Sequence, residues 1–134
     1  MSSSTSDAEY KQKKINIFKI GGLWCFKYFF GDKEIFKELL EYYNQDKYRF
    51  ELATVGERNK MMKYLERKGF ELALIENPSD YSVKIDRAKR YAPILKNSID
   101  HKEEEKIRIF IMKDLASVKE ALENGAEKYS GNSF

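Results

Sequence analysis

The stretch Ile15–Phe30, INIFKIGGLWCFKYFF, decides the fold, because Gly21-Gly22 divides it into two apolar runs. A two-residue link between β-prone runs favours a tight hairpin, since such turns need a positive φ that glycine adopts at little cost. In the resulting register Ile20 faces Leu23, and Phe18 faces Cys25. The pattern therefore predicts an antiparallel pair of strands near the start of the chain.

The two faces of this hairpin differ in polarity, because side chains alternate between faces along a strand. One face is apolar throughout and is expected to be core: Ile15, Ile17, Trp24, Phe26, Tyr28 and Phe30. The other face is apolar near the turn and more polar farther out: Lys14, Asn16, Phe18, Ile20, Leu23, Cys25, Lys27 and Phe29. Either a helix of the same chain covers this second face, or it meets a partner.

Helix and strand signals alternate after the hairpin. Asp32 can cap a helix over about residues 33–43, in which apolar residues recur at helical spacing. Residues 48–52 alternate and predict a half-buried strand. Thr54 and Glu57 then match a capping box that begins a helix running to about residue 68, where Gly69 is the expected stop.

The second half of the chain gives a less regular pattern. Residues 70–75 and 81–85 flank a loop rich in turn formers, so they predict a second hairpin. The segment 87–106 is ambiguous, because Pro93 breaks any long helix. A strand over residues 106–112 and a helix over about 114–124 follow, the helix burying Leu115, Val118 and Leu122.

These elements predict an α+β domain over residues 15–129, with polar, disordered tails at 1–14 and 130–134. The expected architecture is a single mixed, mainly antiparallel sheet with about three helices packed mostly on one face. A ferredoxin-like arrangement, or an elaboration of it, is the closest superfold.

Composition indicates the compartment and the kind of organism in which we expect the protein. The chain has 134 residues, of which 42% are hydrophobic and 35% charged. One cysteine excludes an intrachain disulfide, and no apolar stretch approaches the length of a membrane span, so we expect a cytoplasmic protein without a membrane partner. Abundant lysine and glutamate with two glutamines resemble the composition of thermophilic or archaeal proteins.

Signatures of common enzymes and metal sites are absent from the sequence. Cys25 and His101 are single residues of their kinds, and one of each cannot supply a usual tetrahedral zinc site. Phosphate-loop, dinucleotide, HExxH and GxSxG patterns do not occur. We therefore predict no catalytic residues, no metal and no cofactor, and a binding module rather than an enzyme.

Basic residues supply the main functional lead. The net charge is +3, and residues 56–98 carry ten basic and six acidic side chains. The candidate anion-binding residues lie on the second predicted helix and just after the second predicted hairpin: Arg58, Lys60, Lys63, Arg67, Lys84, Arg87, Lys89 and Arg90. If these two groups converge, they form one surface that can neutralise phosphates. Tyr91 or Phe29 could then stack on an exposed base.

The sequence thus favours a small binding module for an anionic partner, with nucleic acid first among such partners. An alternative is a protein-interaction or homodimerisation scaffold that uses the second hairpin face through Phe18, Leu23 and Phe29. A third hypothesis is a phosphate- or carboxylate-binding protein or enzyme with its pocket near Gly56, at a helix start.

Overall fold

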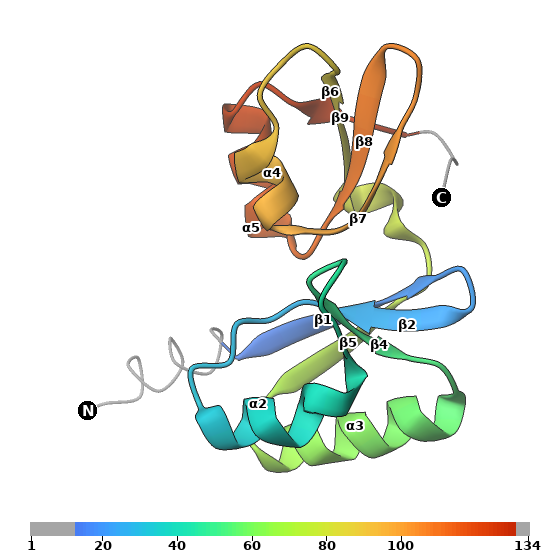
Figure 1. Cartoon of the computed structure of the whole chain (residues 1–134), viewed down its shortest axis with the longest axis vertical. Coiled ribbons are helices and arrows are strands. Elements are labelled where there is room, and N and C mark those ends of the chain that lie inside the picture. Colours follow the sequence, from blue (N-terminus) through green and yellow to red (C-terminus); the bar gives the residue numbers. More distant parts are fainter. Residues whose placement is uncertain (1–12, 131–134) are drawn as a thin grey trace.

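Two α+β units are stacked along the long axis of the molecule (Figure 1). The structure is a computed structural model, and it describes residues 13–130. We call residues 13–76 the N-terminal unit and residues 82–130 the C-terminal unit. Each unit has its own sheet, with helices on one face of that sheet (Figure 1).

The N-terminal unit holds a five-stranded sheet of order β3-β4-β2-β1-β5. Its strands are β1 (Lys14–Ile20), β2 (Leu23–Phe26), β3 (Tyr43–Asn44), β4 (Arg49–Leu52) and β5 (Glu71–Ile75). The predicted hairpin register is confirmed, because Ile20 lies opposite Leu23 and Phe18 opposite Cys25. Gly21 at the turn has a φ of 61°, a conformation that favours glycine. All pairings are antiparallel except that of β1 with β5.

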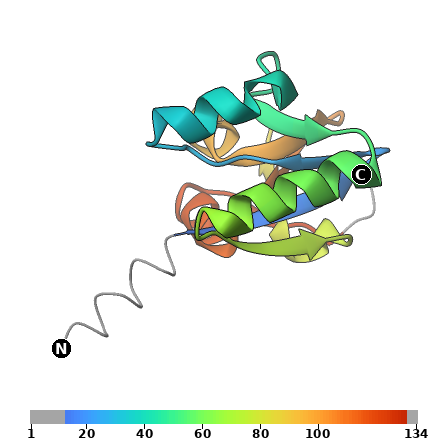
Figure 2. The ribbon, with the colours of Figure 1, turned by 90° about the horizontal axis from the view of Figure 1, so that it is seen from below.

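Two α-helices cover one face of this sheet, as seen from below in Figure 2. They are α2 (Lys33–Leu39), which continues into a short 3₁₀ helix η1 (Leu40–Tyr42), and α3 (Val55–Arg67). The predicted caps are confirmed. The Asp32 carboxylate accepts from the Glu34 N–H at 2.8 Å, and the Thr54 hydroxyl accepts from the Glu57 N–H at 3.0 Å. Gly69, with a φ of 94°, follows α3 as expected.

The core of the N-terminal unit lies between the sheet and these helices. It contains every residue of the predicted apolar hairpin face, with Tyr28 partly buried and the other five buried. Leu39 from α2 and Leu65 from α3 complete it from the helical side. Burial of this apolar surface is the main force that holds α2 and α3 on the sheet.

The C-terminal unit holds a four-stranded antiparallel sheet of order β7-β8-β6-β9. Its elements are β6 (Ser82–Asp86), α4 (Ala92–Lys96), β7 (Ser98–Glu103), β8 (Ile107–Met112), α5 (Leu115–Glu123) and β9 (Glu127–Lys128). The order β-α-β-β-α-β in the chain, with this order in space, is the connectivity of ferredoxin-like domains. It is confined to this unit and does not extend over the whole chain.

The α+β class is confirmed, but two expectations about its organisation are wrong. Residues 13–130 form two sheets rather than one, and they contain four α-helices where about three were expected. The second hairpin does not form: β5 pairs with β1, and β6 pairs with β8 and β9 in the other sheet. Between them lies a 3₁₀ helix, η2 (Pro78–Tyr81), which connects the two units.

The last helix also presents a different face from the one expected. Ser117, Val118 and Ala121 are the buried residues of α5. Leu115 and Leu122 are 60% and 38% exposed, because the four-stranded sheet meets the helix on a neighbouring stripe. The expectation that both leucines are core residues is therefore wrong.

The second hairpin face, whose covering the sequence left open, is closed near its turn by the C-terminal unit. Phe18 and Cys25 are fully buried there with Ile99 and Ile111 from the second sheet. Tyr81 meets Phe18 edge-to-face, with ring centroids 5.1 Å apart. The cover is thus a sheet of the same chain, rather than a helix or a partner.

A buried arginine also joins the two units. Arg49 on β4 is 3% exposed, and its guanidinium lies 2.8 Å from the Glu51 carboxylate on the same strand. It reaches the C-terminal unit by donating to the Ile99 carbonyl at 2.9 Å and by lying 3.6 Å from the Asp100 carboxylate. The units therefore share both an apolar core and a buried ionic contact.

The predicted tails fall largely outside the described residues, namely at 1–12 and 131–134. The boundary expected after Lys14 lies earlier, since Lys14 is part of β1 and the Lys13 carbonyl accepts from the Glu71 N–H at 2.9 Å. That the two units behave as one domain stays a prediction. No helix in residues 13–130 combines the length and apolarity needed to cross a membrane.

Candidate functional site: a cleft between the two units

A cleft of about 810 Å³ lies where the two units meet. We call it the main cleft. Its walls come from the segment after β2, from the β3–β4 hairpin, from α4 and its C-terminal end, and from the end of β8. The lining residues are Lys27, Tyr28, Phe29, Tyr43, Tyr48, Phe50, Ala92, Leu95, Lys96, Asn97 and Lys113. Its size is that of a typical small-ligand site.

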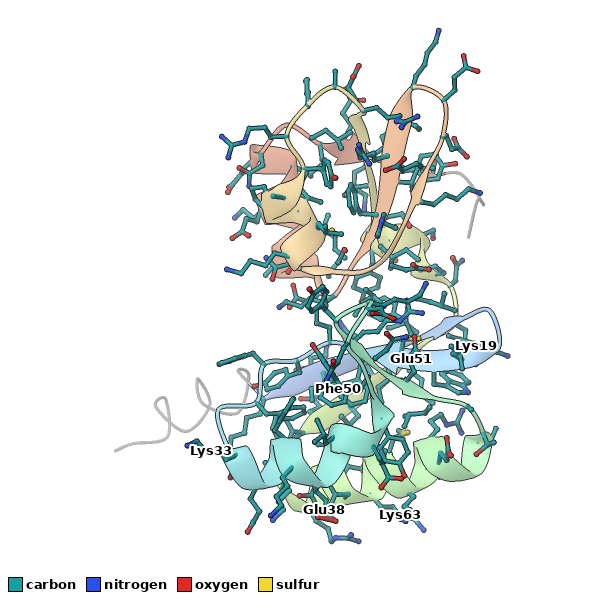
Figure 3. All side chains as sticks on the ribbon, in the orientation of Figure 1. Lys19, Lys33, Glu38, Phe50, Glu51 and Lys63 are labelled. Atoms are coloured by element: carbon teal, nitrogen blue, oxygen red, sulfur yellow. The ribbon has the colours of Figure 1, made fainter. Side chains whose placement is uncertain are left out.

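Aromatic rings form most of the wall that the N-terminal unit contributes. Phe50 is buried at the base of this wall, stacked on Phe26 and in edge contact with Tyr43, each with ring centroids 4.9 Å apart. Figure 3 labels Phe50 within the N-terminal unit, where it belongs to the core between the sheet and the helices. Phe29 and Tyr48 are 92% and 67% exposed. The cleft therefore combines rings fixed by the core with rings that are open to a ligand.

The turn that presents Tyr48 is held in an uncommon conformation. Tyr48 has a φ of 54°, in the left-handed region that bulky residues rarely adopt. The Asn44 side chain fixes the turn by accepting from the N–H groups of Asp46 and Lys47 at 2.9 and 3.1 Å. Tyr48 is thus displayed from a structured turn.

Three lysines line the main cleft, and no described lining residue is acidic. Lys27 follows β2, and its ammonium donates to the Lys96 carbonyl at the end of α4 at 3.3 Å. Lys96 itself is exposed. Lys113 follows β8, and its ammonium lies 3.0 Å from the Asp114 carboxylate. The cleft is therefore positively charged as well as aromatic.

Lys27 lies near two other positive charges, those of Lys113 and Arg49. Burial, together with the smaller effect of the positive charges of Lys113 and Arg49, lowers the pKa of this ammonium to about 8. An anion in the cleft would reduce this repulsion and favour the charged form of Lys27. The site is thus electrostatically suited to anionic ligands.

A smaller cleft of about 390 Å³ shares Lys27, Tyr28 and Lys113 with the main cleft. We call it the side cleft. Its remaining lining residues are Lys14, Ile15, Asn16, Tyr81, Asp114, Leu115 and Ala116. The shared residues make the two clefts neighbours along the contact between the units.

The structure does not bring the two predicted basic groups together. The first group lies on α3 at one end of the molecule, where Lys63 points away from the C-terminal unit (Figure 3). The second group lies on β6 and the loop after it, which reaches the opposite end (Figure 1). The members are, on α3, Arg58, Lys60, Lys63 and Arg67, and, on the other unit, Lys84, Arg87, Lys89 and Arg90.

Two of these basic side chains already have structural partners. The Arg58 guanidinium packs on Trp24, 4.6 Å from the ring centroid, and Arg87 lies 3.2 Å from the Glu103 carboxylate. Because the two groups are separated, they cannot form the continuous positive surface that the sequence suggested. Binding of nucleic acid by either group alone stays a prediction.

The four predicted stacking or interface residues have different surroundings. Phe18 is fully buried between the units, and Leu23 packs beside it, half-buried, so Phe18 is not available to a partner. Tyr91 is half-buried under the Arg108 guanidinium, which lies 4.0 Å from its ring centroid. Phe29 is the one that the structure places in a cleft.

Sequence reasoning missed most of the cleft, namely Lys27, Tyr43, Tyr48, Lys96 and Lys113. They come from four separate segments, and no spacing in the sequence links them. A partial signal was present after β2, where the face of the hairpin that carries Phe29 also carries Lys27. That juxtaposition of a cation and an exposed ring could have marked the N-terminal wall.

The other residues that the sequence analysis considered for chemistry are Gly56, Cys25 and His101, and each has ordinary structural surroundings. Gly56 lies in the first turn of α3 and lines neither of the two clefts. Burial raises the pKa of the Cys25 thiol to about 11, so the thiol stays protonated near neutral pH. His101 stacks on Phe110, with ring centroids 5.8 Å apart. Among residues 13–130, no cluster of His, Cys, Asp and Glu side chains could hold a metal ion.

Comparison with known proteins adds no functional assignment. No family model, no curated protein and no solved structure matches this chain. The ferredoxin-like character of the C-terminal unit is therefore a statement about connectivity alone, and the candidate site depends on its own geometry and chemistry.

Proposed function

We propose that the protein binds single-stranded nucleic acid, with a base inserted in the main cleft. The observation that carries the proposal is the combination of exposed aromatic rings and lysines in one cleft that has no described acidic lining residue. Proteins that bind single strands use this combination, because aromatic rings stack on bases and lysines neutralise phosphates. Nucleic acid is the ligand class that the sequence favoured, but the binding surface is now the main cleft instead of the two basic groups.

The two kinds of side chain have separate roles in this proposal. Tyr48 and Phe29 are the exposed rings and would contact the base faces. Lys96 and Lys27 would contact the backbone on either side, since both line the same cleft. Stacking is tolerant of sequence because every base has an aromatic face. We therefore expect weak sequence preference and clear salt dependence.

Fluorescence anisotropy with a labelled oligonucleotide of about 12 nucleotides, a length within the range that such sites cover, tests the proposal. We expect Tyr48→Ala and Phe29→Ala each to weaken binding about tenfold, because base stacking contributes about 1–3 kcal/mol per base. Neutralisation of two phosphates by Lys27 and Lys96 predicts a slope of about −1.4 for log affinity against log salt.

The α3 basic group supplies the matched control. Charge reversal of Lys60, Lys63 and Arg67, which lie away from the main cleft, should change the affinity much less than Tyr48→Ala does. The opposite result would move the interface to α3. Absence of binding to any single-stranded oligonucleotide at about 50 mM salt, where phosphate contacts are stronger than at physiological salt, would overturn the proposal. Binding of double-stranded and single-stranded forms with equal affinity would also overturn it.

A further inference from the structure

The side cleft has the chemistry of a phosphate site. Lys14, Lys27 and Lys113 face it, and Asp114 is the one carboxylate among its described lining residues. That carboxylate is already engaged, because it accepts from the Ser117 N–H at 2.7 Å and pairs with the Lys113 ammonium at 3.0 Å. The side cleft therefore presents an excess of positive charge.

Hydrogen-bonding groups of the side cleft come from both units. The Asn16 amide on β1 donates to the Lys113 carbonyl at 3.1 Å, which ties the end of β8 to the N-terminal unit. Burial raises the pKa values of Tyr28 and Tyr81, so both phenols stay neutral and can donate hydrogen bonds near neutral pH. An anion entering here would meet ammonium and hydroxyl donors from both units.

We propose that the side cleft holds a phosphate of the nucleotide whose base stacks in the main cleft, with Lys27 and Lys113 as its principal contacts. The inference rests on the proposed function for the base, but the phosphate contacts can be tested without it. Lys27 and Lys113 line both clefts, so one ligand can reach them from the main cleft. The phosphate is either terminal or internal in the strand, and the chemistry is the same.

The first test compares a nucleoside with its 5′-monophosphate by calorimetric titration of the full chain. We expect the monophosphate to bind at least about tenfold more tightly, since hydrogen bonds to charged groups are the strong ones. Lys27→Met and Lys113→Met should each reduce this ratio, whereas Tyr48→Ala should weaken both ligands and leave the ratio unchanged. Lys63→Met, on exposed α3, is the control that should alter neither quantity.

The pH dependence supplies a second readout for the wild-type chain. Lys113 and Arg49 act electrostatically on the Lys27 ammonium. The other charged or titratable groups that line a cleft with Lys27 are Lys14, Asp114, Tyr28 and Tyr81 in the side cleft and Tyr43, Tyr48 and Lys96 in the main cleft. Because the pKa of free Lys27 is about 8, the ratio should fall as the pH rises from about 7 to 9. The ligand phosphate is already a dianion over this range, since its second pKa is about 6. A ratio independent of pH and of Lys27→Met would overturn the inference.

The outcomes separate this inference from the proposed function. If oligonucleotides bind through Tyr48 but nucleoside and monophosphate bind equally, the phosphate site is refuted and the proposed function stands. If inorganic phosphate shifts the NMR signals of the Lys27 and Lys113 side chains while no nucleoside or oligonucleotide binds, the phosphate site stands and the proposed function fails. Oligonucleotides carrying a 5′-phosphate, a 3′-phosphate or neither then distinguish a terminal phosphate from an internal one.

Discussion

Gly56 and Gly69 lie at opposite ends of α3 and differ in backbone conformation. Gly69 follows α3 with a φ of 94°, where an L side chain is strained, although an added Cβ would meet Lys13 Nζ at no closer than 3.7 Å. Gly56 lies inside the first turn of α3, and a Cβ there would make an ordinary contact of 3.8 Å with Thr54 Oγ1. Backbone conformation, rather than space, therefore separates the two positions.

We expect Gly69→Ala to lower the free energy of unfolding by about 1 kcal/mol, because the left-handed conformation is unfavourable for a residue that has a Cβ atom. Gly56→Ala should raise it by about 0.5 kcal/mol, since alanine loses less backbone entropy on folding. Urea unfolding of both variants beside the wild type measures the difference. Two changes of the same sign would contradict this account of how α3 ends.

At the scale of single elements, α5 depends on its N-cap. The Asp114 carboxylate accepts from the Ser117 N–H at 2.7 Å, which satisfies an N–H that has no partner within the helix. Burial raises the pKa of this carboxyl, but hydrogen bonds from Ser117 and Lys113 outweigh burial and hold the pKa below its usual value. The charged form is thus the stabilising one.

We expect Asp114→Ala to lower the free energy of unfolding by about 1 kcal/mol at pH 7, the usual cost of a lost cap. Because the folded-state pKa is depressed, the stabilisation by charge is present above the unfolded pKa and is lost as the pH falls through the folded pKa. Urea midpoints at pH 7 and at about pH 3 should therefore differ less between variant and wild type in acid. Asp114→Asn keeps an acceptor without the charge, so its midpoint should follow that of the wild type most closely in acid.

Local signals made several elements predictable from sequence. The turn at Gly21, the caps at Asp32 and Thr54 and the helix stop at Gly69 each depend on residues a few positions apart. The second hairpin failed because β5 finds its partner in β1, which is distant in the chain. Strand β7 was obscured by the charged run that begins at His101, since one edge of an antiparallel sheet can carry charged residues in water.

At the scale of the whole molecule, the contact between the units decided both the core and the site. Only a three-dimensional arrangement brings Lys27 near Lys96, which lies 69 positions away in the chain. The sequence indicated that Phe18 and Cys25 needed a cover, but it could not indicate that a second sheet would supply it. The candidate cleft follows from that packing, so it was equally beyond the sequence patterns.

The contact between the two units includes one buried positive charge, that of Arg49, and a substitution measures how much stability depends on it. We expect Arg49→Met to lower the free energy of unfolding by about 3 kcal/mol, because it leaves Glu51 and Asp100 without their cation. This value is at the low end of the range of destabilisation for broken buried ion pairs, because the carboxylate side chains of Glu51 and Asp100 are 20% and 19% exposed. Arg67→Met, at an exposed position, should change the stability by less than about 0.5 kcal/mol. Equal effects of the two substitutions on the urea midpoint would refute a bracing role for Arg49.

The short connection through η2 keeps the two walls of the cleft close together when the interface between the units loosens. Residues 76–81 join β5 to β6, and six residues can span about 20 Å at most. Such a tether keeps the units at an effective concentration in the millimolar range even when their contacts break. Reclosure is then an intramolecular event whose probability does not fall on dilution, so the two walls of the cleft meet again without a search for each other.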